Sequence, residues 1–272
     1  MFGKITERGY CSVRFVHITD THIGPTPQHR VQGQLVLPTL EALVRTINAL
    51  PFEPDFILHT GDVVDDGSEA AYALARPVLQ QLKAPIFYLL GNHDRPKPMQ
   101  QILLGKSSVA QRYDYYVKLN GFGLAVFDSR GPTDPAGTLT ANQLNALRDL
   151  CQPSGPPLII ALHHQPVALD VEWLDYGWDT SQMRLDCEED FLNAIAPARN
   201  RIRGVFFGHV HRSCQVMRDG ILFSTPPSGC AQIVAWPTQH TPIPSPDELP
   251  GFNVVTVLPD QTIIRQHTFL RS

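Results

Sequence analysis

The stretch YLLGNHDRP, residues 88–96, joins an apolar run of strand character to a polar cluster, Asn92, His93 and Asp94, directly after Gly91. A turn uses Gly and Asn for backbone reasons, but it does not need an imidazole and a carboxylate beside them. The stretch therefore predicts a β-strand whose carboxyl end carries side chains that take part in chemistry.

On both sides of this stretch, short β-branched or aromatic runs alternate with longer runs of helical period, which is the pattern of a layered α/β protein. Ser68 stands where an N-cap is expected before one of the helical runs. The expected strands are 13–19, 55–60, 85–90, 156–163 and 203–208, and the expected helices are 37–50, 68–83 and about 185–198.

The last quarter of the sequence has a different character. Turn residues at 218–220 and 259–261 each separate two short apolar runs, and they predict antiparallel hairpins. Between these hairpins, segment 236–251 is too rich in proline for regular structure and is expected to be a long surface loop.

The composition excludes several classes of protein. The 272 residues are 43% hydrophobic and 18% charged, which is typical of a soluble globular protein. With 22 basic and 26 acidic side chains and no Lys/Arg block, the chain lacks the charge pattern of a protein that binds duplex nucleic acid or an anionic membrane. The apolar runs are far shorter than the ~20 residues of a membrane span, and we expect no targeting segment.

The cysteines indicate a reducing compartment. They are odd in number, widely spaced and without a CxxC pair, which argues against a disulfide framework and against a zinc site made of thiolates. A cytoplasmic location is therefore expected. The five cysteines are Cys11, Cys151, Cys187, Cys214 and Cys230.

The polar cluster after residues 88–90 is one of five, because nearly every expected strand ends in a similar group. Ligands of open α/β sheets collect at the carboxyl ends of the strands. Taken singly, each group is an ordinary turn or strand end, but five of them at five strand ends are hard to reach by chance. In chain order the groups are Asp20 and His22, Asp62 and Asp65, Asn92 with His93 and Asp94, His163 and His164, and His209 and His211.

These residue types point to a metal centre. In an Asp-x-His or His-x-His pair, an extended backbone puts both side chains on one face, so both can reach one site. A mixed set of Asp, Asn and His without Cys suits Zn, Mn or Fe better than it suits Ca²⁺. The groups offer more ligands than one ion needs. A carboxylate shared by two ions ~3.5–4 Å apart would use the excess, as in sites for in-line displacement at phosphorus.

The motifs DTH, GDVVD, GNHD, HH and GHVH resemble those of the calcineurin-like metallophosphoesterase superfamily, and they extend over residues 17–211. Within them, HITDTHIG, GDVVDDGSEAAYALARPVLQQL and HHQPVALDVEWLD are similar to the class III cyclic nucleotide phosphodiesterases and related glycerophosphodiesterases. The resemblance implies a four-layer α/β-β/α sandwich of two mixed sheets with flanking helices. It also implies a single domain over residues 1–272, with the Pro-rich loop at 236–251.

The resemblance further implies a dinuclear site of two divalent or trivalent ions, Fe, Mn or Zn. Asp62 would bridge the ions, and His163, which directly follows the apolar strand, matches the ligand position better than the adjacent His164, although both stay open. The first ion would be bound by Asp20, His22, Asp62 and His211, and the second by Asp62, Asn92, His163 and His209.

Three further residues of the motifs are expected to act without binding metal. His93 matches the catalytic histidine, and Asp65 matches a carboxylate that orients it. Asp94 is either a similar support or a plain helix cap. Asn92 would also stabilise the equatorial charge of the phosphoryl group, and His93 would donate a proton to the leaving alkoxide.

We therefore expect a metal-dependent phosphodiesterase that hydrolyses a small soluble diester, a cyclic nucleotide or a glycerophosphodiester, by attack of a metal-bound hydroxide. A phosphomonoesterase or protein phosphatase on the same site is a second reading, since the motifs do not separate these activities. A non-catalytic metal-binding scaffold is a third. A homodimer is possible, and the sequence leaves it open.

The rim of the site is expected to choose the substrate. The segment 170–179 carries Trp173, Tyr176 and Trp178, which would either stack a base or anchor the loop or a dimer contact. Segment 236–251 is either a lid or a connection. The two remaining strand histidines, at positions 17 and 59, are expected to be buried structural residues.

Overall fold

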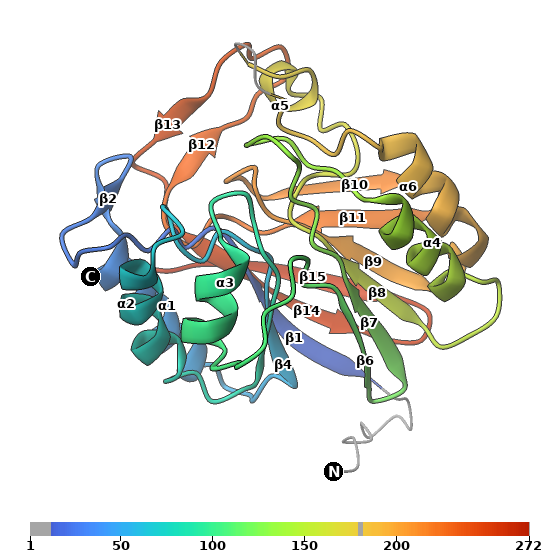
Figure 1. Ribbon diagram of the computed structural model, residues 1–272, viewed down its shortest axis with the longest axis horizontal. Coiled ribbons are helices and arrows are strands. Elements are labelled where there is room, and N and C mark those ends of the chain that lie inside the picture. Colours follow the sequence, from blue (N-terminus) through green and yellow to red (C-terminus); the bar gives the residue numbers. More distant parts are fainter. Residues whose placement is uncertain (1–11, 179–181, 272) are drawn as a thin grey trace.

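Two mixed β-sheets form the centre of the protein, seen in a computed structural model that describes residues 12–178 and 182–271 (Figure 1). Cys11 and residue 179, which belong to predictions above, lie outside the described residues. The first sheet, in the order β15–β14–β1–β4–β5, consists of Thr262–Thr268, Gly251–Val257, Val13–Ile18, Phe56–His59 and Ile86–Tyr88. The second, in the order β10–β11–β9–β8–β7–β6, consists of Cys214–Arg218, Ile221–Thr225, Ile202–Phe206, Leu158–Ala161, Phe122–Val126 and Tyr115–Leu119.

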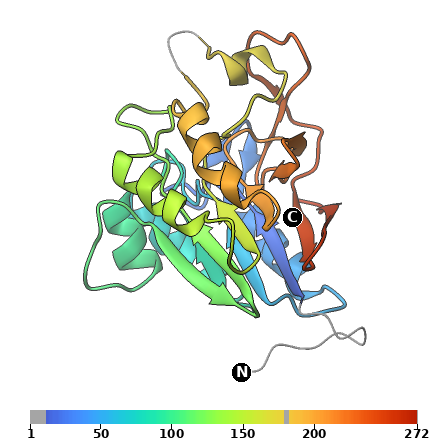
Figure 2. The same cartoon turned by 90° about the vertical axis from the view of Figure 1, so that its right-hand side faces the viewer.

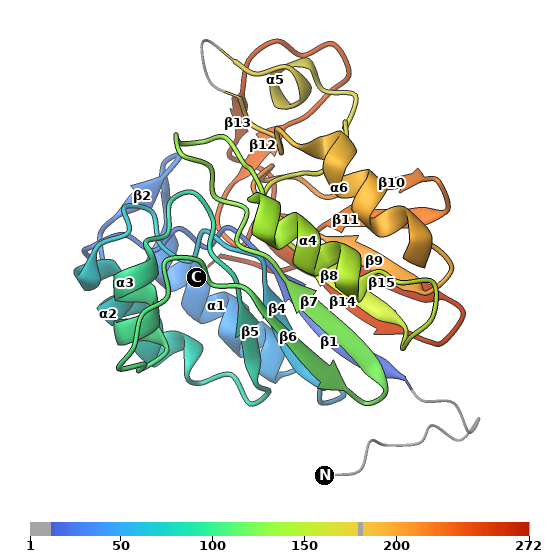
Figure 3. The ribbon, with the colours of Figure 1, turned by 45° about the vertical axis from the view of Figure 1, so that its right-hand side comes forward.

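Helices cover the outer face of each sheet. Helices α1 and α2 pack on the first sheet and α4 and α6 on the second, so the layers run helix, sheet, sheet, helix (Figures 1 and 3). The helices are α1 Val36–Asn48, α2 Glu69–Leu79, α3 Pro96–Pro98, α4 Ala141–Leu150, α5 Glu172–Asp175 and α6 Glu188–Ile195, with a π-helical turn Met99–Leu103 and a 3₁₀ turn Ala196–Ala198. This is the four-layer arrangement that the resemblance implied, and the prediction is confirmed.

The inner strands of each sheet are buried on both faces because they are apolar at consecutive positions. In β8, Ile159 and Ala161 belong to the core between the sheets, whereas Ile160 belongs to the core under α4 and α6. Between the sheets, the Phe15 ring stacks on Phe56 at 4.8 Å and meets Phe206 edge-on at 5.2 Å. This shared core favours the one-domain organisation, which stays a prediction.

The predicted elements form, with shifted ends. Ser68 caps α2 by accepting from the backbone N–H of Ala71 at 3.2 Å, as expected. Helix α2 ends at Leu79 instead of residue 83, and strand β8 ends at Ala161, two residues before the expected end. Both predicted hairpins are present, as β10–β11 and β14–β15.

Two parts of the chain differ from expectation. Segment 236–251 is not wholly irregular, because Ile243–Ser245 forms β13 and pairs antiparallel with β12, Gln232–Val234. Pro244 within β13 does not prevent this pairing, since a short edge strand tolerates Pro. The hairpin β6–β7 was not predicted, although its turn at Asn120–Gly121, with φ of 48° and 86°, is an Asn-Gly turn flanked by apolar runs.

The topology brings the five polar strand ends together. Strands β1, β4 and β5 are parallel in the first sheet, and β8 and β9 are parallel in the second. The loops after them meet at one edge. His163 Nδ1, after β8 of the second sheet, lies 2.7 Å from the Thr60 carbonyl oxygen, after β4 of the first sheet. Within the second sheet, the Gly208 N–H donates to the His163 carbonyl at 3.0 Å. Above this edge, α5 and the β12–β13 hairpin form a separate rim (Figure 2). The small hairpin of β2 (Arg30–Val31) and β3 (Gln34–Leu35) extends this rim on the side of the first sheet (Figure 1).

Candidate metal centre

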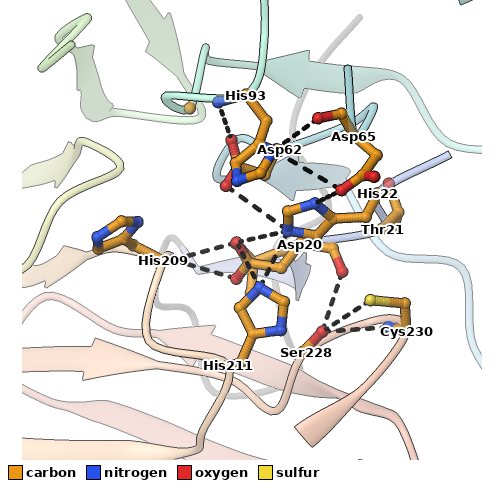
Figure 4. Close-up of polar contacts among 12 residues, drawn as sticks. Asp20, Thr21, His22, Asp62, Asp65, His93, His209, His211, Ser228 and Cys230 are labelled. Atoms are coloured by element: carbon orange, nitrogen blue, oxygen red, sulfur yellow. Dashed lines mark hydrogen bonds and ion pairs between the residues drawn. The ribbon is translucent and has the colours of Figure 1, made fainter. Parts of the chain in front are cut away.

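A first cluster of donor atoms joins the loops after β1 and β9. Asp20, His22 and His211 place their ligand atoms within 4.8 Å of one another, and all three are buried. The Oδ1 atom of Asp20 lies 3.9 Å from Nε2 of His22 and 3.8 Å from Nε2 of His211 (Figure 4). The two Nε2 atoms are 3.0 Å apart.

A second cluster joins the loops after β4, β8 and β9. Asp62, His163 and His209 form it. The Nε2 atom of His163 lies 3.2 Å from Oδ2 of Asp62 and 3.3 Å from Oδ1 of Asn92. The same Oδ2 atom lies 3.6 Å from Nε2 of His22 in the first cluster. One carboxylate oxygen of Asp62 is therefore shared by the two clusters.

The hydrogen bonds of the first cluster fit a metal ion. The Nδ1 atom of His22 lies 3.0 Å from Oδ1 of Asp65, and Nδ1 of His211 lies 2.9 Å from the Ala231 carbonyl oxygen. Because these oxygens only accept, each Nδ1 carries a proton. The neutral rings then point unprotonated Nε2 atoms at each other across 3.0 Å, which is favourable only when a cation lies beside both.

The hydrogen bonds of the second cluster also fit a metal ion. The Nδ1 atom of His163 donates to the Thr60 carbonyl oxygen, which leaves Nε2 to face Asp62. Nε2 of His209 is buried and has no hydrogen-bond partner among the described residues. Carboxylate and imidazole donors of this kind suit Zn, Mn and Fe.

Burial sets the charge of these imidazoles. It lowers the pKa of His211 to about 4 and also lowers the pKa of His22 and His209, so these rings are neutral at pH 7 and able to bind a cation. Burial acts on His163 in the same direction, but attraction to Asp62 outweighs it and raises the pKa of His163 to about 9. Asp62 thus favours a positive charge beside His163, and a metal cation would supply that charge.

The Asp-x-His and His-x-His pairs are not extended, and here the sequence-based expectation was wrong. Asp20, His22, His209 and His211 have φ of 52°, 45°, 73° and 49°, in the left-handed region. The His22 N–H donates to the Asp62 carbonyl at 3.0 Å, so the loop curls around its neighbour instead of continuing as a strand. Such backbone costs about 1–3 kcal/mol per residue and is concentrated at functional sites.

The geometry favours His163 over His164 as the ligand. The His163 ring reaches Asp62 and Asn92, as described above. His164 turns away: its Nδ1 atom lies 2.9 Å from the Ser129 hydroxyl, and its ring packs against Gly137, where a Cβ atom would lie 2.3 Å from the His164 Cγ.

His93 lies at the exposed edge of the centre, with 40% of its side chain accessible. Its Nδ1 atom lies 2.6 Å from the Asp65 carbonyl oxygen and 3.7 Å from the Asp65 carboxylate. The carbonyl of Asp65 therefore orients His93, whereas its carboxylate bonds to His22 and His29. The predicted pairing of Asp65 with His93 is present, but through the main chain.

Asp94 is a support and not a helix cap, since Arg95 occupies the N-cap position of α3. Its carboxylate accepts from the Tyr72 hydroxyl at 2.7 Å and from the backbone N–H of Gly91 at 3.0 Å and of Val63 at 3.2 Å. These bonds hold the loops after β4 and β5 together. His17 and His59 are fully buried within β1 and β4, as expected.

Three supporting residues were missed. Ser228 donates to the Asp20 carbonyl at 3.0 Å, Tyr72 bonds to Asp94, and His29 lies 2.8 Å from Asp65. Tyr72 stands on the buried stripe of a helix and His29 in a loop outside the motifs, so spacing gives no signal for either. Ser228 follows strand β11, outside the five polar strand-end groups, and spacing gives no signal for it either.

A cavity of about 340 Å³ lies over the centre. Trp178 lines it and is 47% exposed, whereas Trp173, also in its lining, is only 2% exposed and belongs to the core. Tyr176 is 78% exposed and is not among the lining residues. The polar residues of the metal centre in the lining are His22, Asp62, Asp65, Asn92, His93, His209 and His211, and the other lining residues are Val31, Gln32, Pro135, Trp173, Trp178, Met183, Ile233 and Pro242.

The sequence of this chain matches that of a known protein family, in agreement with the two clusters of metal-binding residues. Residues 13–213 match the family described as calcineurin-like phosphoesterase. The chain belongs to the calcineurin-like phosphoesterase family. It is thus a metal-dependent phosphoric ester hydrolase. The family uses a dinuclear metal centre, and the two donor clusters are groups that could bind metal ions.

Several curated proteins are similar to this phosphoesterase over most of their length. A 3′,5′-cyclic-nucleotide phosphodiesterase of Nostoc is 27% identical, with 92% of this chain and 90% of the relative covered. The 3′,5′-cyclic adenosine monophosphate phosphodiesterase CpdA of Vibrio vulnificus is 31% identical, with 81% and 78% covered. A cAMP/cGMP dual specificity phosphodiesterase of Mycobacterium tuberculosis is 28% identical, with 91% and 77% covered.

Solved structures share the fold at low identity. A purple acid phosphatase from yellow lupin superimposes with a TM-score of 0.63 at 14% identity, over 98% of this phosphoesterase and 52% of the lupin chain. GAP50 of Plasmodium gives a TM-score of 0.62 at 14% identity, over 96% and 90% of the two chains. Among residues 12–178 and 182–271, no helix has the length and apolar character needed to cross a membrane.

Proposed function

We propose that this phosphoesterase is a two-metal phosphodiesterase that hydrolyses 3′,5′-cyclic nucleotides. The observation that carries the proposal is the shared Asp62 Oδ2 atom, which lies 3.2 Å from His163 Nε2 and 3.6 Å from His22 Nε2. The curated relatives named as cyclic nucleotide phosphodiesterases support the substrate class.

In this proposal the two donor sets hold one ion each, with Asp62 in both. When bound, the ions lower the pKa of a coordinated water and neutralise charge on the phosphoryl oxygens. Asp20, His22, Asp62 and His211 hold the first ion, and Asp62, Asn92, His163 and His209 hold the second.

His93 serves the leaving group. Because its Nδ1 is occupied by the Asp65 carbonyl at 2.6 Å, Nε2 is the ring atom left to hold a proton for the departing ester oxygen. The exposed position of this ring, at the polar edge of the cavity, lets it reach a bound substrate. Asn92 turns its amide towards the second cluster, where it can also donate to an equatorial oxygen.

The cavity suits a nucleotide. Its volume of about 340 Å³ is within the ~300–1,000 Å³ of small-molecule sites, and its lining combines apolar side chains with the polar residues of the metal centre. Trp178 offers an exposed ring for stacking, so the expectation of a base-stacking residue in segment 170–178 is kept for this residue. Pro242 brings part of segment 236–251 into the lining of the cavity, which favours a substrate-covering role over a plain connection.

Comparison of three esters tests the proposal. Metal-stripped protein is reconstituted with Mn²⁺ and assayed with cAMP, with bis(p-nitrophenyl) phosphate and with p-nitrophenyl phosphate. We expect hydrolysis of both diesters to depend on Mn²⁺ and to exceed that of the monoester. A preference for the monoester would support the phosphomonoesterase reading instead, and two bound metals without turnover of any ester would support the scaffold.

The location and assembly stay proposals as well. The four cysteines that the structure describes are free, in agreement with a reducing cytoplasm. A homodimer is the assembly we would test first, by light scattering of the metal-loaded protein.

A further inference from the structure

His29 stands outside every recognised motif, yet its ring is held at the edge of the metal centre. It lies in the loop between β1 and β2, and its Nε2 atom is 2.8 Å from Oδ2 of Asp65. Because a carboxylate only accepts, His29 is the donor. Both side chains are 26% exposed, so this bond is partly shielded from water.

Asp65 is thereby bonded to imidazoles on both of its oxygens. Its Oδ1 atom accepts from Nδ1 of His22 at 3.0 Å, while Oδ2 accepts from His29 (Figure 4 shows the His22 side). Two bonds on opposite oxygens fix the plane of the carboxylate, which one bond would leave free to turn about its Cβ–Cγ axis. The orientation of Asp65 in turn fixes the ring of His22, whose Nε2 faces Asp20 and Asp62.

The backbone around His29 is shaped to admit its ring. A Cβ atom added at Gly24 would lie 1.9 Å from the His29 Cγ and 2.3 Å from its Cδ2, so only glycine lets the ring lie there. The loop is closed by its own hydrogen bonds, since the His29 N–H donates to the Thr26 carbonyl at 3.1 Å and its carbonyl accepts from Val36 at 3.3 Å. The ring is thus placed by the fold and does not swing freely in solvent.

We propose that His29 is a positioning residue of the metal centre, which orients Asp65 and, through it, the imidazole of His22. The inference rests on the proposed assignment of His22 as a metal ligand. It assigns His29 no contact with substrate. Its expected contribution is that of other groups that hold a metal-binding histidine in place, a factor of about 10–100 in metal affinity or activity.

Three variants of the full chain test this, with Mn²⁺ affinity measured by competition with a chelator and turnover measured with bis(p-nitrophenyl) phosphate. His29→Leu introduces an apolar side chain of similar size and removes the donor, and we expect Mn²⁺ affinity or kcat to fall about 10- to 100-fold with KM nearly unchanged. His29→Gln can donate from its amide to the same oxygen, and it should restore most of the loss. Gly24→Ala keeps His29 but displaces its ring, and it should resemble His29→Leu.

The control is His267→Leu on the exposed strand β15, where the ring stacks on Phe252 away from the centre. It should bind Mn²⁺ and turn over as the parent does, and thermal unfolding in EDTA checks that every variant is folded. The inference is overturned if folded His29→Leu matches the parent in both Mn²⁺ affinity and kcat, or if His29→Gln gives no recovery. Failure of the parent itself to bind two Mn²⁺ ions would overturn the proposed metal assignment and this inference with it.

Discussion

The backbone N–H of His93 donates to Oδ1 of Asp62 at 2.9 Å. The other oxygen, Oδ2, faces His163 and His22. The two oxygens of this carboxylate are therefore separated in role, one anchored by the main chain and one left for cations. Since the anchor is the main chain of His93, Nε2 of its imidazole is left for the substrate.

This separation predicts that the ring of His93 can be removed without loss of metal. In His93→Ala the N–H to Asp62 remains, so two metal equivalents should stay bound while kcat for bis(p-nitrophenyl) phosphate falls by about 10²–10⁴, the usual worth of a positioned proton donor. Elemental analysis of the purified variant and steady-state kinetics check both parts. Loss of metal together with activity would show that the ring itself holds the centre.

Asp62→Ala should behave in the opposite way. Removal of the shared carboxylate takes one ligand from each cluster, so we expect the variant to retain less than one metal equivalent after dialysis. Its folding is checked by circular dichroism in EDTA. Full loading of both sites in this variant would contradict the bridging role.

A single methyl group at Gly91 should also empty the centre. A Cβ atom there would lie 2.1 Å from Oδ1 of Asp62, and that carboxylate is buried and cannot retreat. Gly91→Ala is therefore expected to lose metal. The matched control is Gly220→Ala in the β10–β11 turn, where φ is +77° and nothing lies within 4 Å of the new atom. It should cost about 1–2 kcal/mol of unfolding free energy, because alanine is strained in left-handed backbone, and keep both ions.

The adjacent histidines give a sharper comparison. His163→Gln removes a ring whose Nε2 faces Asp62, whereas His164→Gln removes one that bonds to Ser129. Both are fully buried, so both variants should lose stability. Only His163→Gln should lose a metal equivalent. If His164→Gln is the variant that loses metal, the ligand assignment between the two must be exchanged.

The sequence could predict much of this site because its residues stand at strand ends. Asp20, Asp62, Asn92, His163 and His209 each follow an apolar run, and parallel strands bring such positions to one edge whatever the details of packing. This prediction did not require knowing which sheet each strand belongs to. Three strand ends come from one sheet and two from the other, and they still meet.

What the sequence could not show is the set of contacts that depends on loop shape. The left-handed backbone at Asp20 and His22 arises from bonds to the loop after β4, not from local preference. His29 reaches Asp65 only because its loop folds back over Gly24. Such contacts join residues with no fixed spacing, so no periodicity reports them. Strand β13 was missed for a different reason: its partner β12 is close in the sequence, but the prolines of segment 236–251 conceal the strand pattern.

Gln32 gives a prediction about the substrate. It lies at the turn of the β2–β3 hairpin and lines the cavity, and its Oε1 atom is buried without a hydrogen-bond partner among the described residues. An amide of this kind can bond to the edge of a base. Gln32→Leu is therefore expected to raise KM for cAMP about 2- to 10-fold, the worth of one hydrogen bond, with no change for bis(p-nitrophenyl) phosphate, which has no base.

The matched control for Gln32 is Gln34→Leu. Gln34 lies on strand β3 of the same hairpin and is not among the lining residues of the cavity. It should leave KM for both esters unchanged. Equal effects of Gln32→Leu on the two esters would indicate a general change of the cavity and would remove Gln32 from base recognition.

His17 predicts how the metal-free protein responds to acid. Its Nε2 atom bonds to the Thr60 hydroxyl at 2.9 Å in a fully buried position, and burial, helped by the nearby His59, lowers its pKa from 6.5 to about 3. Below pH 6.5 the unfolded chain takes up a proton that the folded chain refuses. Stability is therefore lost as pH falls from 6.5 towards 3, by about 1.4 kcal/mol per pH unit for this one group. In His17→Gln, which can keep the bond to Thr60, urea unfolding in EDTA between pH 7 and 4.5 should show a slope smaller by that amount. Above pH 7, where neither the folded nor the unfolded state binds the proton, the free energies of unfolding of the two proteins should depend on pH with the same slope. Parallel curves throughout the range would mean that His17 is not a source of acid sensitivity.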